Sequence, residues 1–215
     1  MTGSPAPEAR LLAGASIRPM SSTLPPLIHD PLPYETLLAP RAREDIDLVV
    51  IHCTELPDLA AARRFGEQVR YPSGTGNSGH FYIDRDGAIH QYVDVARVAH
   101  HVRGYNERSI GVELVNRGRF PSWLASASQA MDEPYTEPQL VALTGLLQRL
   151  AAELPGLRHI EGHEQLDTDE VASDDDPATN VRRKLDPGPL FPWERVLAST
   201  RLRRLVPAGQ GPAAP

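Results

Sequence analysis

The stretch DLVVIH, residues 47–52, determines how the rest of the chain is interpreted. Four apolar residues stand in an unbroken row, and a histidine closes the row. A short continuous apolar run is typical of a strand buried on both faces, as in the sheet of an α/β protein. The sequence therefore predicts a central strand that ends in a polar side chain, His52.

Strand and helix signals alternate on the C-terminal side of this run. Two β-rich segments flank Asp86-Gly87 within 80–93, which indicates a hairpin, and SIGVELVN (109–116) predicts another strand. RHIEGH (158–163) predicts a strand that again ends in a histidine, His163. Helices are expected over residues 58–69, 136–154 and 193–199.

The second of these helices is marked at both ends. Thr136 and Gln139 have the spacing of a capping box, and Pro155-Gly156 is a stop signal. Between them, leucines recur on one helical face. The alternation of strands with amphipathic helices predicts a single α/β domain, in which helices flank a central mixed β-sheet.

The length of 215 residues is enough for one well-buried domain. Residues 1–40 and 206–215 are rich in proline and alanine, and such segments bury too little apolar surface to offset their ordering entropy. We therefore expect an extended N-terminal arm over 1–40, a folded domain over 41–205 and a flexible tail over 206–215.

The composition disfavours several classes of partner and location. The net charge of −6 gives no chain-wide basic surface for nucleic acid or anionic lipid. Cys53 is the only cysteine, so no intrachain disulfide is possible, and a reducing compartment is compatible. No standard signal segment and no run of about 18 apolar residues is present. We expect a cytoplasmic monomer without a membrane span, with the cell envelope as the alternative location.

Two predicted strands end in histidine, and a third candidate ligand follows in KLDPGPLFPW (184–193). Three prolines and a glycine fix the backbone around its aspartate. The strand ends of an α/β sheet open into the crevice where ligands bind, so His52, His163 and Asp186 can converge there. Two imidazoles and a carboxylate suit a zinc site with an open fourth position. Spacing alone is a weak signal, because no His-x-His or His-Glu-x-x-His motif is present.

Five blocks of sequence carry a family resemblance: VVIHCT (49–54), GHFYIDRDGAIHQYVD (79–94), HHVRGYNERSIGVELVN (100–116), EGH (161–163) and KLDPGPLFPW (184–193). In this order they resemble the type-2 N-acetylmuramoyl-L-alanine amidases, zinc enzymes related to the peptidoglycan recognition proteins and to phage lysozyme-type amidases. The resemblance spans about residues 45–200. It implies the fold of that family and hydrolysis of the amide between the lactyl group of N-acetylmuramic acid and L-alanine of the stem peptide.

The resemblance also implies a role for individual residues. The zinc ligands that it implies are His52, His163 and Asp186. It implies that Glu113 takes a proton from the attacking water and passes it to the leaving amine, and that Lys184 stabilises the oxyanion. His100 and Asn106 fall where the family lines its substrate groove. The partners implied are peptidoglycan fragments or muropeptides.

These residues also have structural interpretations. Glu113 can pair with a surface arginine, Lys184 can simply end the basic run RRK, and Asp186 can open a turn. For the whole chain, the alternatives are a non-catalytic peptidoglycan-binding module and a cysteine peptidase that uses Cys53. Because adjacent strand residues point to opposite faces, we expect the Cys53 thiol to lie in the core, facing away from the metal.

Of the other histidines, His80 suits either burial beneath the site or substrate contact. The remaining four are interpreted as ordinary polar or core residues: His29, His90, His101 and His159.

Two stretches depart from compact members of the family. Residues 164–183 form an acidic insertion, which we expect to be a solvated, mobile loop rather than a calcium site, and which can lengthen one wall of the groove. Residues 117–134 carry Phe120 and Trp123, whose rings can stack on sugars or pack on the core. Both stretches leave open whether the substrate is polymeric peptidoglycan or a soluble anhydro-muropeptide.

Overall fold

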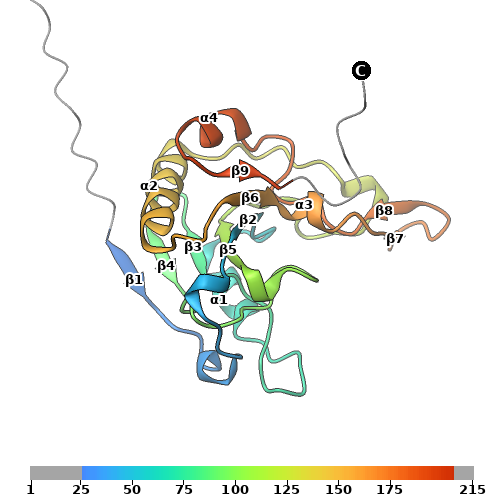
Figure 1. Ribbon diagram of the computed structural model, residues 1–215. Helices are drawn as coiled ribbons and strands as arrows, with labels where there is room; N and C mark the ends of the chain where they lie inside the picture. Colours follow the sequence, from blue (N-terminus) through green and yellow to red (C-terminus); the bar gives the residue numbers. More distant parts are fainter. Residues whose placement is uncertain (1–25, 206–215) are drawn as a thin grey trace, which may run out of the picture.

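The computed structural model describes residues 26–205, and seven of its strands form one mixed sheet (Figure 1). The order across the sheet is β1-β4-β3-β5-β2-β6-β9. Only β3 and β4 pair antiparallel; the other neighbours are parallel. The strands are β1 (Leu27–His29), β2 (Leu48–Cys53), β3 (Phe81–Ile83), β4 (Ile89–Gln91), β5 (Ser109–Leu114), β6 (His159–Gly162) and β9 (Arg203–Arg204). The predicted central mixed sheet is confirmed.

Strand β2 lies inside this sheet, between β5 and β6, and all six of its residues are buried. Its side chains alternate between the two faces. Val49 and Ile51 belong to the large core cluster that includes α2, whereas Leu48 and Val50 belong to a small cluster on the other face. His52 continues the second series, so the strand carries it to the face opposite α2.

Helix α2 (Glu137–Glu153) covers one face of the sheet (Figure 1). Its start is the predicted capping box: the Thr136 side chain accepts from the Gln139 backbone N–H, and the Gln139 side chain accepts from the Thr136 N–H. The buried leucines of α2 pack against β2, β5 and β6 in the largest apolar cluster. Burial of one such leucine stabilises the fold by about 1.5–3 kcal/mol, so this helix anchors the sheet.

The other predicted helices and the hairpin are present with shorter bounds. Helix α1 (Leu59–Gly66) begins after Asp58, whose carboxylate accepts from the Ala61 N–H. Helix α4 (Trp193–Ala198) follows Pro192. Strands β3 and β4 form the predicted hairpin around Asp86-Gly87, where Gly87 takes a φ of 88°.

Part of the expected N-terminal arm belongs to the fold. Strand β1 pairs with β4, and Leu32, Tyr34 and Leu38 are buried in a second apolar cluster beside α1. The expectation of an extended arm is therefore wrong for residues 26–40, because these apolar side chains find a surface to cover that local composition does not reveal. The rest of the arm, residues 1–25, and the expected tail over 206–215 lie outside the described residues.

The acidic insertion is also folded. It begins within α3 (His163–Leu166) and continues as a two-stranded hairpin of β7 (Glu170–Ala172) and β8 (Asn180–Arg182). Its acidic groups serve as acceptors: the Asp175 carboxylate accepts from the backbone N–H groups of Ser126 and Ala127, at 2.6 and 3.1 Å. The expected loop is thus a hairpin fastened to the neighbouring segment 117–134.

Candidate active site

Strands β2 and β5 place two polar side chains next to each other on the face opposite α2. His52 stands opposite Glu113 in the parallel register of these strands. On β5, Ile110, Val112 and Leu114 face the core around α2, so Glu113 points the other way. The alternation of the strand therefore delivers an imidazole and a carboxylate to one side of the sheet.

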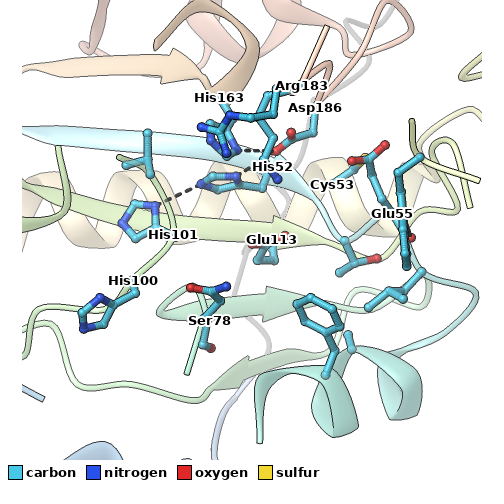
Figure 2. Close-up of a pocket in the computed structure, with 18 of the residues that line it drawn as sticks. His52, Cys53, Glu55, Ser78, His100, His101, Glu113, His163, Arg183 and Asp186 are labelled. Carbon is cyan, nitrogen blue, oxygen red and sulfur yellow. Dashed lines mark hydrogen bonds and ion pairs between the residues drawn. The ribbon is translucent and has the colours of Figure 1, made fainter. Parts of the chain in front are cut away.

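Three buried side chains converge above this point (Figure 2). One carboxylate oxygen of Asp186, Oδ2, lies 2.8 Å from Nδ1 of His52 and 3.1 Å from Nδ1 of His163. One ligand atom from each residue lies within 4.8 Å of the others. Strand β6 ends at Gly162, so His163 opens α3 rather than closing the strand as predicted. The structure thus brings together the three residues that the sequence proposed as metal ligands.

The segment that carries Asp186 is held from several sides. The Asp186 carbonyl accepts from the Glu164 backbone N–H at 2.9 Å, and the Tyr135 hydroxyl donates to the Pro187 carbonyl at 2.7 Å. Gly162 packs so closely under Pro187 that a Cβ there would lie 2.9 Å from its ring. These contacts fix the carboxylate against the two imidazoles.

Charge at this cluster favours a cation. Burial acts to raise the pKa of Asp186, but His163 and His52, with the charge of Lys184, hold the pKa well below its usual range. The carboxylate is therefore ionised. Its second oxygen, Oδ1, is buried and has no hydrogen-bond partner among the described residues. An ionised carboxylate with a free buried oxygen between two imidazoles suits a bound cation.

Glu113 has the properties of a general base. Burial raises its pKa from 4.5 to about 7, with smaller opposing effects of His52 and Lys184. No Lys, Arg or His nitrogen within residues 26–205 lies in ion-pairing distance of its carboxylate, which argues against the surface-pair interpretation. A carboxyl with a pKa near neutrality can both accept and return a proton.

The raised pKa of Glu113 predicts a pH-dependent stability of the metal-free protein. Below pH 4.5 the carboxyl is protonated in both the folded and the unfolded state. Between pH 4.5 and about 7 the unfolded chain loses this proton while the buried carboxyl keeps it, so about 3 kcal/mol of unfolding free energy is lost by the time the pH exceeds 7. Metal-free Glu113→Gln should therefore be more stable than the wild type above pH 7 and equally stable below pH 4.5. Urea denaturation at both pH values measures this, and equal stability above pH 7 would contradict it.

The cluster lies in a cavity of about 560 Å³ that Glu113, His100, Asn106 and Lys184 also line. The His100 ring packs on Tyr71, with ring centroids 4.9 Å apart. Asn106 also forms local hydrogen bonds, because its side-chain oxygen accepts from the backbone N–H groups of His101 and Val102. All seven residues that the sequence proposed for the site therefore border one cavity.

Lys184 is the only lysine in the sequence. The 22 lysine and arginine residues of the chain are otherwise all arginines. Within the described part of the chain its ammonium group forms no ion pair, whereas its neighbour Arg183 pairs with Asp167. A compact, unpaired cation on the wall of the cavity is available to an anionic group.

One residue of the site was missed by the sequence analysis. His101, interpreted there as an ordinary residue, is half-buried in the cavity wall, and its Nδ1 lies 3.0 Å from Nε2 of His52. Burial, followed by the charge of His52, lowers the pKa of His101 well below its usual value. The signal available in the sequence was its place beside His100 in HHVRGYN. His80, by contrast, is buried away from the cavity, where Nδ1 accepts from the Gly111 N–H at 3.0 Å.

Cys53 follows His52 on β2 but is not part of the ligand cluster. It is a buried free cysteine, as predicted, but it also borders the cavity that holds the cluster. Burial, reinforced by Asp186 and Glu55, raises the pKa of its thiol well above the ordinary value. Because the thiolate is the reactive form, this environment argues against a cysteine peptidase.

The segment 117–134 forms one wall of the cavity. Trp123 lines it and donates from its indole N–H to the Glu55 carbonyl at 2.9 Å, whereas Phe120 packs on the core cluster beside α1. The buried Arg119 pairs with Glu55 and donates to the Arg182 carbonyl at the end of β8. The acidic insertion is thereby tied to the same wall.

Comparison with known proteins gives concordant matches. Residues 42–189 match the family described as N-acetylmuramoyl-L-alanine amidase. The endolysin of Escherichia phage T7 is 32% identical over 122 residues, which cover 54% of this chain and 74% of the phage protein.

Solved structures match as well. The N-acetylmuramoyl-L-alanine amidase LysC from Clostridium intestinale superposes with a TM-score of 0.59 at 19% identity, over 83% of this chain and 99% of LysC. The Escherichia coli amidase AmiD, in complex with the substrate anhydro-N-acetylmuramic acid-L-Ala-D-γ-Glu-L-Lys, superposes with a TM-score of 0.55 at 23% identity, over 75% of this chain and 59% of AmiD.

Proposed function

The chain belongs to the N-acetylmuramoyl-L-alanine amidase family and is an amidase of that kind, and from this premise we propose how its cavity performs the reaction. A zinc ion is held by His52, His163 and Asp186. The amide that is cleaved joins the lactyl group of N-acetylmuramic acid to L-alanine of the stem peptide. Glu113 and Lys184 act on the reacting atoms.

The observation that carries this proposal is the convergence of two Nδ1 atoms on one oxygen of Asp186, at 2.8 and 3.1 Å. The donor set fits zinc, because two neutral imidazoles and one carboxylate leave a fourth position open. When bound, zinc lowers the pKa of a coordinated water to about 7 and polarises a carbonyl group.

Glu113 moves the proton in this proposal. The attacking water loses a proton to a Glu113 carboxylate oxygen as its oxygen bonds to the amide carbon. Glu113 then returns the proton to the amide nitrogen, and the C–N bond breaks to release the L-alanine amine. Its pKa of about 7 supports both transfers, since a base near the working pH also serves as an acid.

Lys184 stabilises the oxyanion. The carbonyl oxygen gains negative charge when the water adds, and the ammonium group of Lys184 borders the same cavity without an ion-pair partner among the described residues. A preorganised cation in a partly water-excluded site lowers the barrier because it needs no reorganisation during the reaction.

The groove walls hold the substrate. Aromatic rings line the cavity at His100, which packs on Tyr71, and at Trp123. The substrate printed for the AmiD complex is an anhydro-muropeptide, and we propose a muropeptide or peptidoglycan fragment as the substrate here. His100 contacts it, and Asn106 does so through the part of its amide that the backbone leaves free. The presence of ligands, base and cation together favours catalysis over a binding module.

Product analysis tests this function. The protein is incubated with an anhydro-muropeptide and, separately, with polymeric peptidoglycan, in the presence of zinc or of a chelator. We expect mass spectrometry to find intact stem peptide with a free L-alanine amine, only without chelator, and activity to return when zinc is added back. Fragments cut between sugars or within the peptide would contradict the proposal, and the faster of the two substrates identifies the preferred class.

A monomeric state and a cytoplasmic location stay predictions from the sequence. Light scattering tests the first, and fractionation of cells tests the second. Within residues 26–205 no helix has both the length and the apolar character needed to cross a bilayer.

A further inference from the structure

Both ring nitrogens of His52 have partners. Nδ1 faces Asp186, and Nε2 faces Nδ1 of His101 at 3.0 Å. The chain of contacts continues beyond His101, whose Nε2 lies 3.2 Å from the Ser109 hydroxyl. That hydroxyl lies 2.7 Å from the Tyr105 carbonyl.

The position of each proton in this series of hydrogen bonds can be assigned by starting from its last acceptor, the Tyr105 carbonyl. A carbonyl only accepts, so Ser109 donates its single proton to Tyr105. The Ser109 oxygen is then an acceptor, and His101 donates to it from Nε2. A neutral His101 with its proton on Nε2 carries a lone pair on Nδ1, which accepts from Nε2 of His52. When a cation is bound, the remaining nitrogen of His52, Nδ1, is thereby left with its lone pair for that cation.

The opposite order is incompatible with a bound metal. If His101 donated to Nε2 of His52, the His52 proton would lie on Nδ1 and point at Asp186. A protonated Nδ1 has no lone pair for a cation. The direction of the two imidazole contacts therefore decides whether the cluster can bind metal.

The His101 ring is held in place by neighbouring segments on several sides. It lies against Gly111 of β5, where a Cβ atom would be 2.7 Å from the ring carbon Cγ. On the other side, its backbone N–H donates to the Asn106 side chain at 3.0 Å. Its ring meets the His52 ring edge-on, at an interplanar angle of 85°. Gly111 and Ser109 stand two residues apart on the strand, so the same face of β5 provides both the space and the acceptor.

We propose that His101 is a positioning residue, which together with Ser109 holds His52 in the tautomer that can bind a metal through Nδ1. It acts through His52 and does not touch the substrate in this role. The inference rests on the metal site proposed above.

The test measures zinc binding and does not need turnover. Zinc affinity of the full chain is measured by competition with a chelator for the wild type, His101→Leu, His101→Gln and Ser109→Ala. Leucine offers no acceptor, whereas the glutamine amide can accept from His52 and donate to Ser109. His90→Leu makes the same chemical change on β4, outside the cavity, and is the matched control. In the zinc-loaded wild type, long-range proton–nitrogen NMR reports which His52 nitrogen carries the proton.

We expect His101→Leu to bind zinc about 10- to 100-fold more weakly, the usual effect of losing a partner of a metal-binding histidine. Ser109→Ala should weaken binding less, while His101→Gln and His90→Leu should stay close to the wild type. The NMR should place the proton on Nε2. Wild-type affinity in His101→Leu, or a proton on Nδ1 in the wild type, would overturn the positioning role alone. A wild type that binds no zinc would overturn the metal site as well. Equal losses in His101→Leu and His101→Gln would indicate damaged packing and would also overturn the inference.

Discussion

Replacing Glu113 with glutamine is expected to lower kcat about 10²- to 10⁴-fold while zinc binding persists. Glutamine keeps the shape of the side chain and removes the group that accepts the proton. The carboxylate lies beside His52 across β2 and β5 but is not part of the ligand cluster, so its loss leaves the three donors in place. Turnover of a muropeptide and zinc content of the same preparation measure the two effects.

Glu164→Gln is the matched control for this variant. Glu164 follows His163 directly, and burial also raises the pKa of its carboxyl group, but its side chain does not border the cavity. This control should therefore keep near-normal turnover. If Glu113→Gln retained more than about one tenth of the wild-type kcat, the assignment of the base would be wrong.

Replacing Lys184 with alanine is expected to lower kcat about 10²- to 10³-fold with little change in KM or in zinc content. The ammonium group is assigned to an oxyanion that forms only during the reaction, so its removal should raise the barrier more than it weakens substrate binding. Steady-state kinetics with a muropeptide separate kcat from KM. An unchanged kcat would show that the cation does not face the reacting carbonyl.

The uniqueness of Lys184 allows an independent check on the unmodified enzyme. A lysine-selective acylating reagent can modify only Lys184 and the terminal amine, because the sequence contains no other lysine and arginine does not react with such a reagent. We expect the wild type to be inactivated and to be protected by bound muropeptide. Lys184→Arg retains the cation and the terminal amine, so any activity that it keeps should resist the reagent. Inactivation of that variant to the same extent would locate the sensitive group elsewhere.

The sequence predicted the elements whose signals are local. The apolar run that becomes β2, the Asp86-Gly87 hairpin and the capping box of α2 each follow from neighbouring residues, and the structure confirms them. It also predicted which three ligand candidates meet, because strand ends gather at one edge of a sheet. The family resemblance supplied Glu113 and Lys184, which spacing alone did not.

The errors concern features that depend on distant contacts. Residues 26–40 were predicted to form an extended arm, because nothing in their composition shows that β1 pairs with β4. The acidic insertion was predicted to be a mobile loop, because the hydrogen-bond donors to its Asp175 carboxylate lie in another irregular segment, at Ser126 and Ala127. His101 was interpreted as an ordinary residue, because its contact with His52 depends on the space that Gly111 of β5 leaves for its ring. In each case the partner lies far away in the chain or on an adjacent strand.

The most direct test of the metal centre is a crystal structure of the zinc-loaded protein with anomalous scattering measured on both sides of the zinc absorption edge. The account predicts one strong zinc peak bonded to Nδ1 of His52, Nδ1 of His163 and a carboxylate oxygen of Asp186, at distances of about 2.0–2.2 Å. A zinc peak bound elsewhere, or no peak among these three side chains, would contradict it.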